Sequence, residues 1–282
     1  MENEKYHVHI SSKHKLFDLK LKEVWKYRDL IWLFTKRSLT VSYKQTVLGP
    51  AWLIISPFLT SVVYTFLFGN IAGMGTDGIP QILFYLSSNA IWGYFAASFR
   101  GNASTFIGNA GVFGKVYFPR LTVPISNVLI QIINFGIQML MVMIFLVYFL
   151  IKGEISPNWY MFPLIPLILI HLGMMGLGMG IIASSITTKY RDLSVVVTFF
   201  ISMWMYGTPV VYPLSQLGDG MLKQLILYNP VTPVIELFRL ALLGKGDILV
   251  LPLIVSCAFT VVVLLVGIVL FNKVERTFMD TV

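Results

Sequence analysis

The chain has 282 residues, of which 56% are hydrophobic and only 12% are charged, and its formal net charge is +8 at neutral pH. The mean hydropathy of +0.78 leaves no room for a sizeable soluble domain. In a soluble protein this basic excess would suggest nucleic-acid binding, but here it flanks apolar stretches, where membrane orientation and anionic headgroups explain it. Composition thus excludes soluble enzymes and nucleic-acid partners and indicates an integral membrane protein.

Six apolar stretches are each near or above the roughly 20 residues that cross a bilayer core as a helix. They run over Leu48–Ile71, Ile82–Phe99, Leu121–Ile151, Met161–Ile186, Leu193–Val211 and Ile248–Phe271. Of the 21 Lys and Arg residues, 17 fall on the side that holds both termini, which are therefore cytoplasmic by the positive-inside rule. We expect an all-α membrane protein with a cytoplasmic segment 1–47, a six-span domain 48–272 and a cytoplasmic tail 273–282.

The segment before the first stretch mixes apolar and basic residues from Leu16 to Arg37. Trp25 and Trp32 suit headgroup depth, and the Lys and Arg side chains suit phosphates. This pattern predicts an amphipathic helix at the cytoplasmic interface. It serves either as a membrane-surface anchor or as a docking surface for a cytoplasmic partner.

Between Arg100 and Arg120 the chain is too rich in glycine and polar residues to span, yet it carries Phe106, Phe113 and Phe118. A cytoplasmic loop with so many apolar side chains needs something to cover it. We therefore expect a second subunit to contact this loop.

Phosphate-binding and catalytic motifs are missing from the sequence. Gly114-Lys115 is not a phosphate loop, because Asn109 stands where the first glycine is needed and Val116 where Ser or Thr is needed. No Ser/His/Asp, Cys/His or metal-ligand cluster occurs in a coherent place. We expect no cofactor and no enzymatic chemistry in this chain.

The region from Val210 to Asp247 is apolar enough to enter lipid but is interrupted by proline and glycine. We expect two short helices that dip into the outer leaflet, since non-helical backbone at that depth must be buried in protein or face water. Gly244 is placed to end the second helix. Glu236 and Arg239, three residues apart, can pair on one face.

The predicted spans contain almost no charge apart from His171, which we expect to be hydrogen-bonded in helix packing. An ion-coupled transporter usually carries intramembrane charges, so energy must come from elsewhere. The fourth stretch has a small-residue face for close helix packing inside the chain. Its members are Gly173, Gly176, Gly180 and Ser184.

Polar and aromatic side chains recur along single faces of several spans. Such rows suit a passage for a sugar chain, because sugar rings offer flat faces to aromatic rings and hydroxyls to Ser, Thr and Tyr. Helix packing and the aromatic belt are the competing explanations, and for the amides of the third stretch we prefer packing. The candidate lining residues are Trp52, Ser56, Thr60, Tyr64, Tyr85, Trp92 and Tyr206.

Several ordered motifs together resemble the membrane subunit of ABC-2 type polysaccharide exporters, most of all the O-antigen type. They are Arg28-Asp29-Leu30, the run from Tyr43 to Trp52, Lys115-Val116-Tyr117-Phe118-Pro119-Arg120, Tyr190-Arg191-Asp192 and Asn229-Pro230-Val231-Thr232-Pro233. The resemblance covers nearly the whole chain from Leu16. It implies a permease in the inner membrane that exports lipid-linked polysaccharide; capsule or teichoic-acid export and, more remotely, a membrane-embedded glycosyltransferase are the alternatives.

The resemblance also implies a homodimer that works with two ATP-binding subunits, which hold the ATP and Mg²⁺. It implies an interface helix before the first span, a coupling helix after the second and re-entrant helices before the sixth. The residues expected to couple to the ATPase are Trp25, Arg28, Phe113, Lys115, Tyr117, Phe118, Pro119, Arg120, Tyr190, Arg191 and Asp192.

Overall fold

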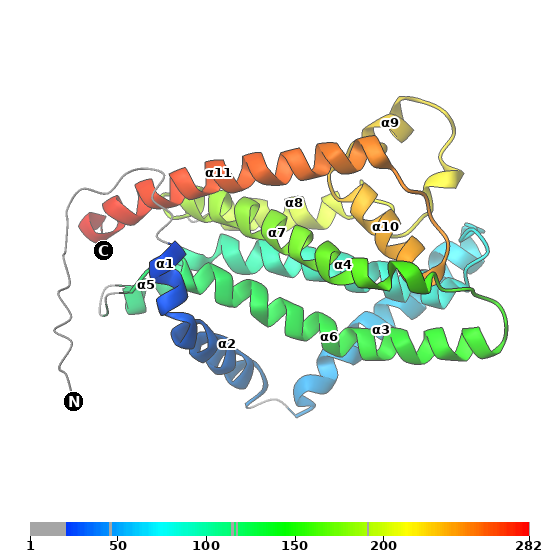
Figure 1. The fold of residues 1–282 in the computed structure, drawn as a ribbon, viewed down its shortest axis with the longest axis horizontal. Coiled ribbons are helices and arrows are strands. Elements are labelled where there is room, and N and C mark those ends of the chain that lie inside the picture. The colour runs from blue at the N-terminus through cyan, green and yellow to red at the C-terminus, as the bar shows by residue number, and fades with distance from the viewer. Residues whose placement is uncertain (1–20, 45–46, 114–115, 117, 191, 282) are drawn as a thin grey trace.

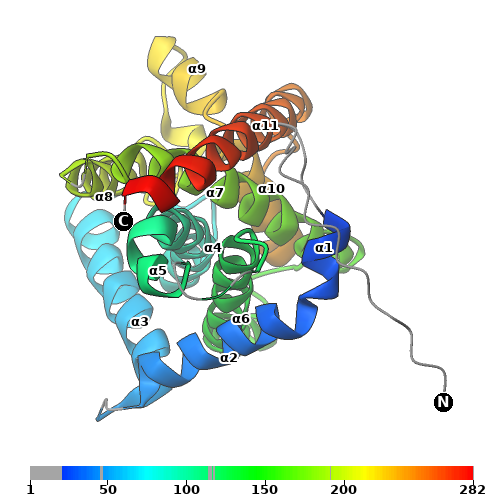
Figure 2. The same cartoon turned by 90° about the vertical axis from the view of Figure 1, so that its left-hand side faces the viewer.

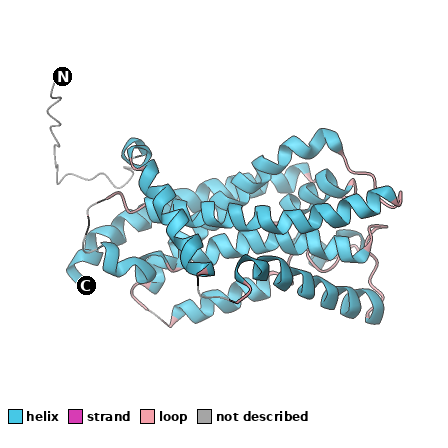
Figure 3. Cartoon of the chain, turned by 90° about the horizontal axis from the view of Figure 1, so that it is seen from below, coloured by secondary structure: helices cyan, strands magenta, loops and turns pink. Residues whose placement is uncertain are grey.

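The computed structural model describes residues 21–44, 47–113, 116, 118–190 and 192–281, without the side chains of residues 21 and 275–281. Within these ranges the chain is helical and has no strand, and loops are confined to the connections (Figure 3). The long helices lie roughly along the longest axis of the molecule (Figure 1). They are α3 (Trp52–Tyr64), α4 (Gln81–Ala103), α6 (Thr122–Ile151), α7 (Ile165–Thr187), α8 (Leu193–Trp204) and α11 (Val250–Thr281).

The two ends of this bundle are built differently. The short helices α1 (Leu21–Lys26) and α5 (Thr105–Phe113) lie at one end, where α11 also finishes (Figure 1). Helices α9 (Met221–Leu227) and α10 (Thr232–Leu243) lie toward the other end. Below, these are the α5 end and the α9 end. Helix α2 (Arg28–Tyr43) crosses beside α6 near the α5 end (Figure 2).

By length and composition, four helices in the described part of the chain are able to cross a membrane. They cover Gly49–Ile71, Trp159–Thr187, Thr122–Ile151 and Val250–Val274, the first including a 3₁₀ turn at Gly49–Ala51 and a π-helix at Thr65–Ile71. Helices α9 and α10, bent by 74°, make a fifth candidate if they form one broken span. These findings confirm an all-helical membrane protein and match four of the predicted stretches.

Helix α4 accounts for the second predicted stretch, but it does not qualify as a lipid-facing span. Its 23 residues suffice in length, whereas its many polar side chains lower its hydropathy. Sixteen of the 23 residues are buried, because α4 packs against α3, α6, α7, α8 and α10. A helix enclosed by protein does not have to be apolar on every face. Buried polar residues such as Ser88 and Asn102 are therefore tolerated in this helix.

Helix α8 is shorter than the fifth predicted stretch, which extends to Val211. It ends at Trp204, and its 12 residues rise only about 18 Å. The chain then turns through Gly207 and Pro209. Proline has no N–H to continue the helical ladder, and glycine disfavours helix, so the prediction of one continuous helix to Val211 is wrong.

The small-residue face of α7 packs against α4, as the sequence indicated. A Cβ atom added at Gly180 would lie 2.4 Å from Cβ of Asn102, and one at Gly176 would lie 2.9 Å from Cβ of Ser98. On another side, a Cβ at Gly178 would lie 3.0 Å from the backbone nitrogen of Leu264 in α11. The backbone of α7 therefore packs directly against α4 and α11, with no α7 side chain between them at these glycines.

Gly180→Ala should destabilise the protein, because the added methyl group meets both the Asn102 side chain and the Phe99 carbonyl oxygen. Overpacking of this kind costs roughly 1–3 kcal/mol. Gly136→Ala is the matched control, since a Cβ there meets nothing within 4 Å and alanine favours helix. Thermal unfolding in detergent should show a lower midpoint for Gly180→Ala only; equal midpoints would contradict this packing.

Candidate functional site

Helices α3 and α8 form the least covered side of the bundle. In the most apolar 18 residues of the first span, only 6% are buried. In α8, Ile201 is the one buried residue. Seen along the long axis, α3 and α8 flank α4 on the same side (Figure 2). Near the α9 end they are linked by the Tyr64 hydroxyl, which lies 3.9 Å from the Met205 sulfur. We call this uncovered side the α3–α8 face.

The predicted lining residues fall into separate groups. Ser56 and Thr60 line a cavity between α3, α4 and α6. Trp52 is 51% exposed at the start of α3, and Tyr206 is 50% exposed beyond the end of α8. Tyr206 also lines an apolar hollow of about 560 Å³ near α9.

The other aromatic candidates are packed inside the chain. Tyr85 is fully buried, and its ring centroid lies 6.1 Å from that of the half-buried Tyr64. Trp92 is also buried and packs edge-on against Trp204, 6.3 Å away. In the single chain these rings pack beneath the ends of α3 and α8. They do not themselves lie open on the α3–α8 face.

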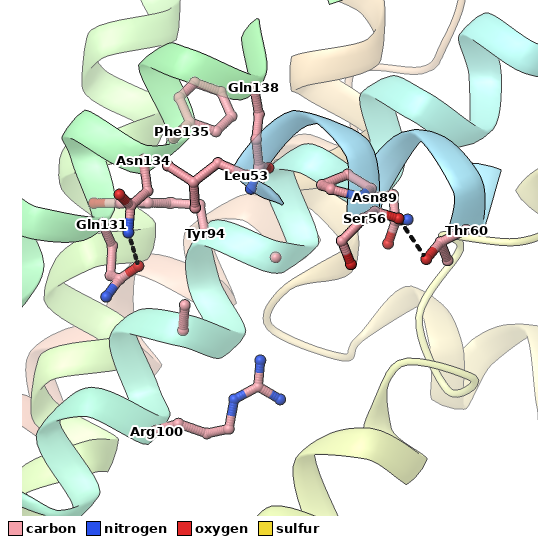
Figure 4. Close-up of a pocket in the computed structure, with 13 residues that line it drawn as sticks. Leu53, Ser56, Thr60, Asn89, Tyr94, Arg100, Gln131, Asn134, Phe135 and Gln138 are labelled. Carbon is pink, nitrogen blue, oxygen red and sulfur yellow. Dashed lines mark hydrogen bonds between the residues drawn. The ribbon is translucent and has the colours of Figure 1, made fainter. Parts of the chain in front are cut away.

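The cavity between α3, α4 and α6 has a volume of about 310 Å³ and is markedly polar. Figure 4 shows Arg100 and Gln138 far apart along it. We call it the amide groove, after the carboxamides of Asn89, Gln131, Asn134 and Gln138 that line it. The sequence reasoning assigned the α6 amides to packing and did not single out Asn89 or Arg100. The spacing of Asn89, Gly93, Ala97 and Arg100 along one α4 face was the available signal.

A buried ion pair joins α4, α10 and the turn after α8. Arg239 Nη1 donates to Glu236 Oε1 at 2.6 Å, while Nη2 donates to Ser88 Oγ at 3.1 Å and to the Pro209 carbonyl at 2.5 Å. The guanidinium also lies over the Phe84 ring, 4.3 Å from its centroid. Both charged side chains are at most 5% exposed. The expected pairing of Glu236 with Arg239 is confirmed.

The elbow between α9 and α10 is fixed by Asn229. Its Oδ1 accepts hydrogen bonds from Trp204 Nε1 and from the Val231 backbone N–H, and its Nδ2 donates to the Gly207 carbonyl. The C-cap Gly244 has the left-handed φ of 71° and ends α10 where the sequence indicated. Hydrogen bonds therefore fix the α9–α10 elbow to the end of α8 and the turn that follows it.

His171 takes part in the same region through helix packing. Its Nε2 lies 2.9 Å from Ser256 Oγ, which in turn donates to the Pro230 carbonyl. This contact ties α7 to α11 and to the α9–α10 elbow. It agrees with the expected packing role.

At the α5 end, the rings of the loop between α4 and α6 are buried in an aromatic cluster with rings from α2 and α11. We expected these loop rings to be exposed in the single chain. Phe113 packs on Phe118 with a centroid separation of 5.8 Å, and Phe118 packs on Phe34 of α2 at 5.5 Å. Phe106 lies 4.8 Å from Phe271 of α11. All but the half-buried Phe34 are buried. The expectation that these rings need a second subunit for burial is therefore wrong, because α2 and α11 of the same chain cover them.

The remaining coupling candidates differ in exposure. Trp25 and Tyr190 are 69% and 52% exposed, and Arg28 is also exposed. Arg120 is buried with its guanidinium 5.6 Å from the Phe113 ring centroid. Pro119 is half-buried beside it.

Asp192 is exposed and stands at the N-cap position of α8, where its side chain makes no capping hydrogen bond. Lys115, Tyr117 and Arg191 lie outside the described residues. No group of three or more His, Cys, Asp or Glu side chains capable of holding a metal occurs in the part of the chain that the structure describes.

Comparison with known proteins defines the class. Residues 29–243 match the model of the ABC-2 type transporter family, and the chain belongs to that family. It is 30% identical over 258 residues to the O-antigen export system permease protein RfbA of Klebsiella pneumoniae, covering 89% of this chain and 94% of the relative. It is 29% identical over 224 residues to the protein of the same name from Myxococcus xanthus, covering 78% and 82% of the two chains.

Arg239→Met should destabilise the fold strongly, because it leaves Glu236 buried without its partner. Breaking a buried pair in this way costs roughly 3–5 kcal/mol, whereas replacing both partners by uncharged residues is often nearly neutral. The double variant Glu236→Gln/Arg239→Met should therefore unfold at a higher temperature than Arg239→Met alone.

The exposed pair Asp219–Lys223, 2.8 Å apart, supplies the control. Lys223→Met should lower the unfolding midpoint far less than Arg239→Met does, as exposed ion pairs contribute little. Thermal unfolding in detergent measures all three variants. A double variant as unstable as Arg239→Met would show that the charge on Glu236 is not the cause.

Proposed function

We propose that this chain is the membrane subunit of an ATP-driven exporter that moves lipid-linked O-antigen polysaccharide across the inner membrane. The observation that carries the proposal is the similarity to two O-antigen export permeases along most of both chains. Membership of the ABC-2 family and the lack of a phosphate loop in the sequence agree with ATP hydrolysis on a separate subunit. The relatives' names favour O-antigen over capsule or teichoic-acid export.

In the proposed topology the chain crosses the membrane six times, with α4 and α8 as the two passes that do not qualify by apolarity and length. The α5 end is cytoplasmic, in keeping with the basic residues near it. Helices α9 and α10 are re-entrant from the opposite side. The backbone of α10 is held by contacts with α4, α7 and α11, as non-spanning segments at membrane depth require, and α9 packs against α10.

A second copy of the chain stands against the α3–α8 face, and the polymer passes between the copies. Side chains exposed on α11 are aliphatic, such as Ile254, Val261 and Leu265, which suits lipid. The exposed side of α8 instead mixes rings with hydroxyls, as at Phe199 and Ser202. Uncharged rings and hydroxyls permit a glycan to slide without a deep energy minimum.

Two ATP-binding subunits dock at the α5 end. After the aromatic cluster is buried within the chain, Trp25, Trp32, Ile107 and Val116 still expose between 39% and 69% of their surface. Ile107 belongs to α5, which is bonded to α7 through the Phe106 N–H and Ser184 Oγ at 3.2 Å. Through this hydrogen bond, a movement of α5 caused by the ATP-binding subunits is transmitted to α7.

Deleting the gene for this chain should abolish surface O-antigen while lipid-linked polymer accumulates on the cytoplasmic side. Plasmid-borne wild-type chain restores export. Val116→Asp should not restore it, because a charge replaces an exposed apolar contact, yet Val116→Ile should. Surface immunoblots and fractionated glycan extracts provide the readout; normal surface polymer in the deletion strain would exclude the proposal.

Single cysteines on the α3–α8 face should react with a charged, membrane-impermeant thiol reagent. Ser56→Cys and Ser202→Cys, both at exposed positions, are tested after Cys257→Ala removes the native thiol. We expect labelling that speeds up during ATP turnover, because the route opens to water. Leu265→Cys on α11 is the lipid-facing control, and faster labelling there than on α8 would overturn the assignment.

A further inference from the structure

The amide groove holds more hydrogen-bonding capacity than the chain itself uses. The Asn134 carboxamide is engaged, since Oδ1 accepts from the Tyr43 hydroxyl at 2.9 Å and Nδ2 donates to Gln131 Oε1 at 3.0 Å. Among the described residues, the side chains of Asn89 and Gln138 have no hydrogen-bond partner and Arg100 has no ion pair. Donors and acceptors at membrane depth need polar partners, which a lipid tail does not provide.

The walls of the groove leave room for a flat ring. On α4, Gly93 and Ala97 lie between Asn89 and Arg100 on one face. Neither carries more than a methyl group, which leaves space between the polar groups. A Cβ at Gly93 would meet only Gln138 Oε1, at 4.0 Å. The volume of about 310 Å³ lies at the lower end of ligand-binding cavities, which suits a small ligand such as one or two sugar units.

The polar groups are ordered along the bundle. Arg100 is close to the end of α4 that leads into α5, and Asn89 lies 11 residues earlier, or about 16 Å deeper by helical rise. Gln131 faces the groove nearer the α5 end of α6, and Gln138 lies two turns further along. The groove therefore places one cation near the α5 end and uncharged carboxamides further toward the α9 end (Figure 4).

Resting on the proposed function, we propose that the amide groove binds the phosphate-proximal sugars of a lipid-linked glycan, with Arg100 facing the phosphate. Carboxamides donate and accept at once, and this matches vicinal sugar hydroxyls. A phospholipid headgroup fits less well, because it offers phosphate for Arg100 but little to satisfy Asn89 and Gln138. The groove adjoins the α3–α8 face, because Ser56 and Thr60 of α3 line it, so it serves as a loading site beside the route.

The test measures binding to the permease reconstituted with its ATP-binding subunits in lipid nanodiscs. Three tritiated probes are compared: a polyprenyl-diphosphate disaccharide, the same polyprenyl diphosphate without sugar, and phosphatidylglycerol. We expect wild-type complex to bind the first probe about tenfold more tightly than the second, through the extra hydrogen bonds. Phosphatidylglycerol should bind weakest.

The double variant Asn89→Leu/Gln138→Leu should remove the preference for the disaccharide probe and leave the other two probes unchanged. Gly93→Leu, which fills the groove and alters no polar group, should have the same effect. Arg100→Gln should weaken both diphosphate probes by the same factor. Gln224→Leu, an exposed amide on α9, is the matched control and should bind like wild type.

Two results would overturn the groove assignment: equal binding of the first two probes by wild type, or an undiminished preference in both the double variant and Gly93→Leu. Failure of the proposed function is a different result, namely normal surface polymer in the deletion strain. If export depends on this chain while the groove variants bind like wild type, only the loading site is wrong.

Discussion

The structure depends on the burial of a polar helix at its centre. Helix α4 carries serines and asparagines that lipid would not accept, and α7 approaches it closely enough that Gly176 and Gly180 leave no space for a Cβ. At the α9 end, Arg239 donates to Ser88 of α4 while paired with Glu236. One buried guanidinium thus secures the central helix to α10. Removal of either charge leaves the other buried and uncompensated, which is strongly destabilising.

The helices that surround α4 are themselves covered to different extents. α3 and α8 flank α4 but have little protein on their outer side, whereas α7 is largely buried. The same asymmetry produces the amide groove, since α3 lies against α4 and α6 without filling the space over Gly93 and Ala97. The amide groove and the exposed rings and hydroxyls that we propose for transport both lie on the side of α4 that faces α3 and α8.

The sequence was sufficient for the membrane class, for four of the six predicted stretches and for some contacts. Apolar length and basic flanks indicated the membrane class, the Gly173–Ser184 spacing indicated close packing, and Glu236 and Arg239 pair as their spacing allowed. The sequence did not predict which helix faces pack inside the chain and which stay exposed. Tyr85 and Trp92 share a face by periodicity, yet that face is buried against the C-terminal ends of α3 and α8. Likewise, Phe113 and Phe118 looked uncovered because their cover comes from α2 and α11, distant in sequence.

The central claim is that the α3–α8 face meets a second copy of the chain. The most direct measurement is disulfide formation between identical single cysteines in native membranes, scanned along exposed positions of α8 and α11 after replacement of Cys257. Cysteines at Val195, Val196, Phe199 or Met203 should give a covalent dimer at some of these α8 positions, with the helical spacing of one face. Those at Ile254, Val261 and Leu265 of α11 should stay monomeric. Dimers through α11 and none through α8 would contradict the account.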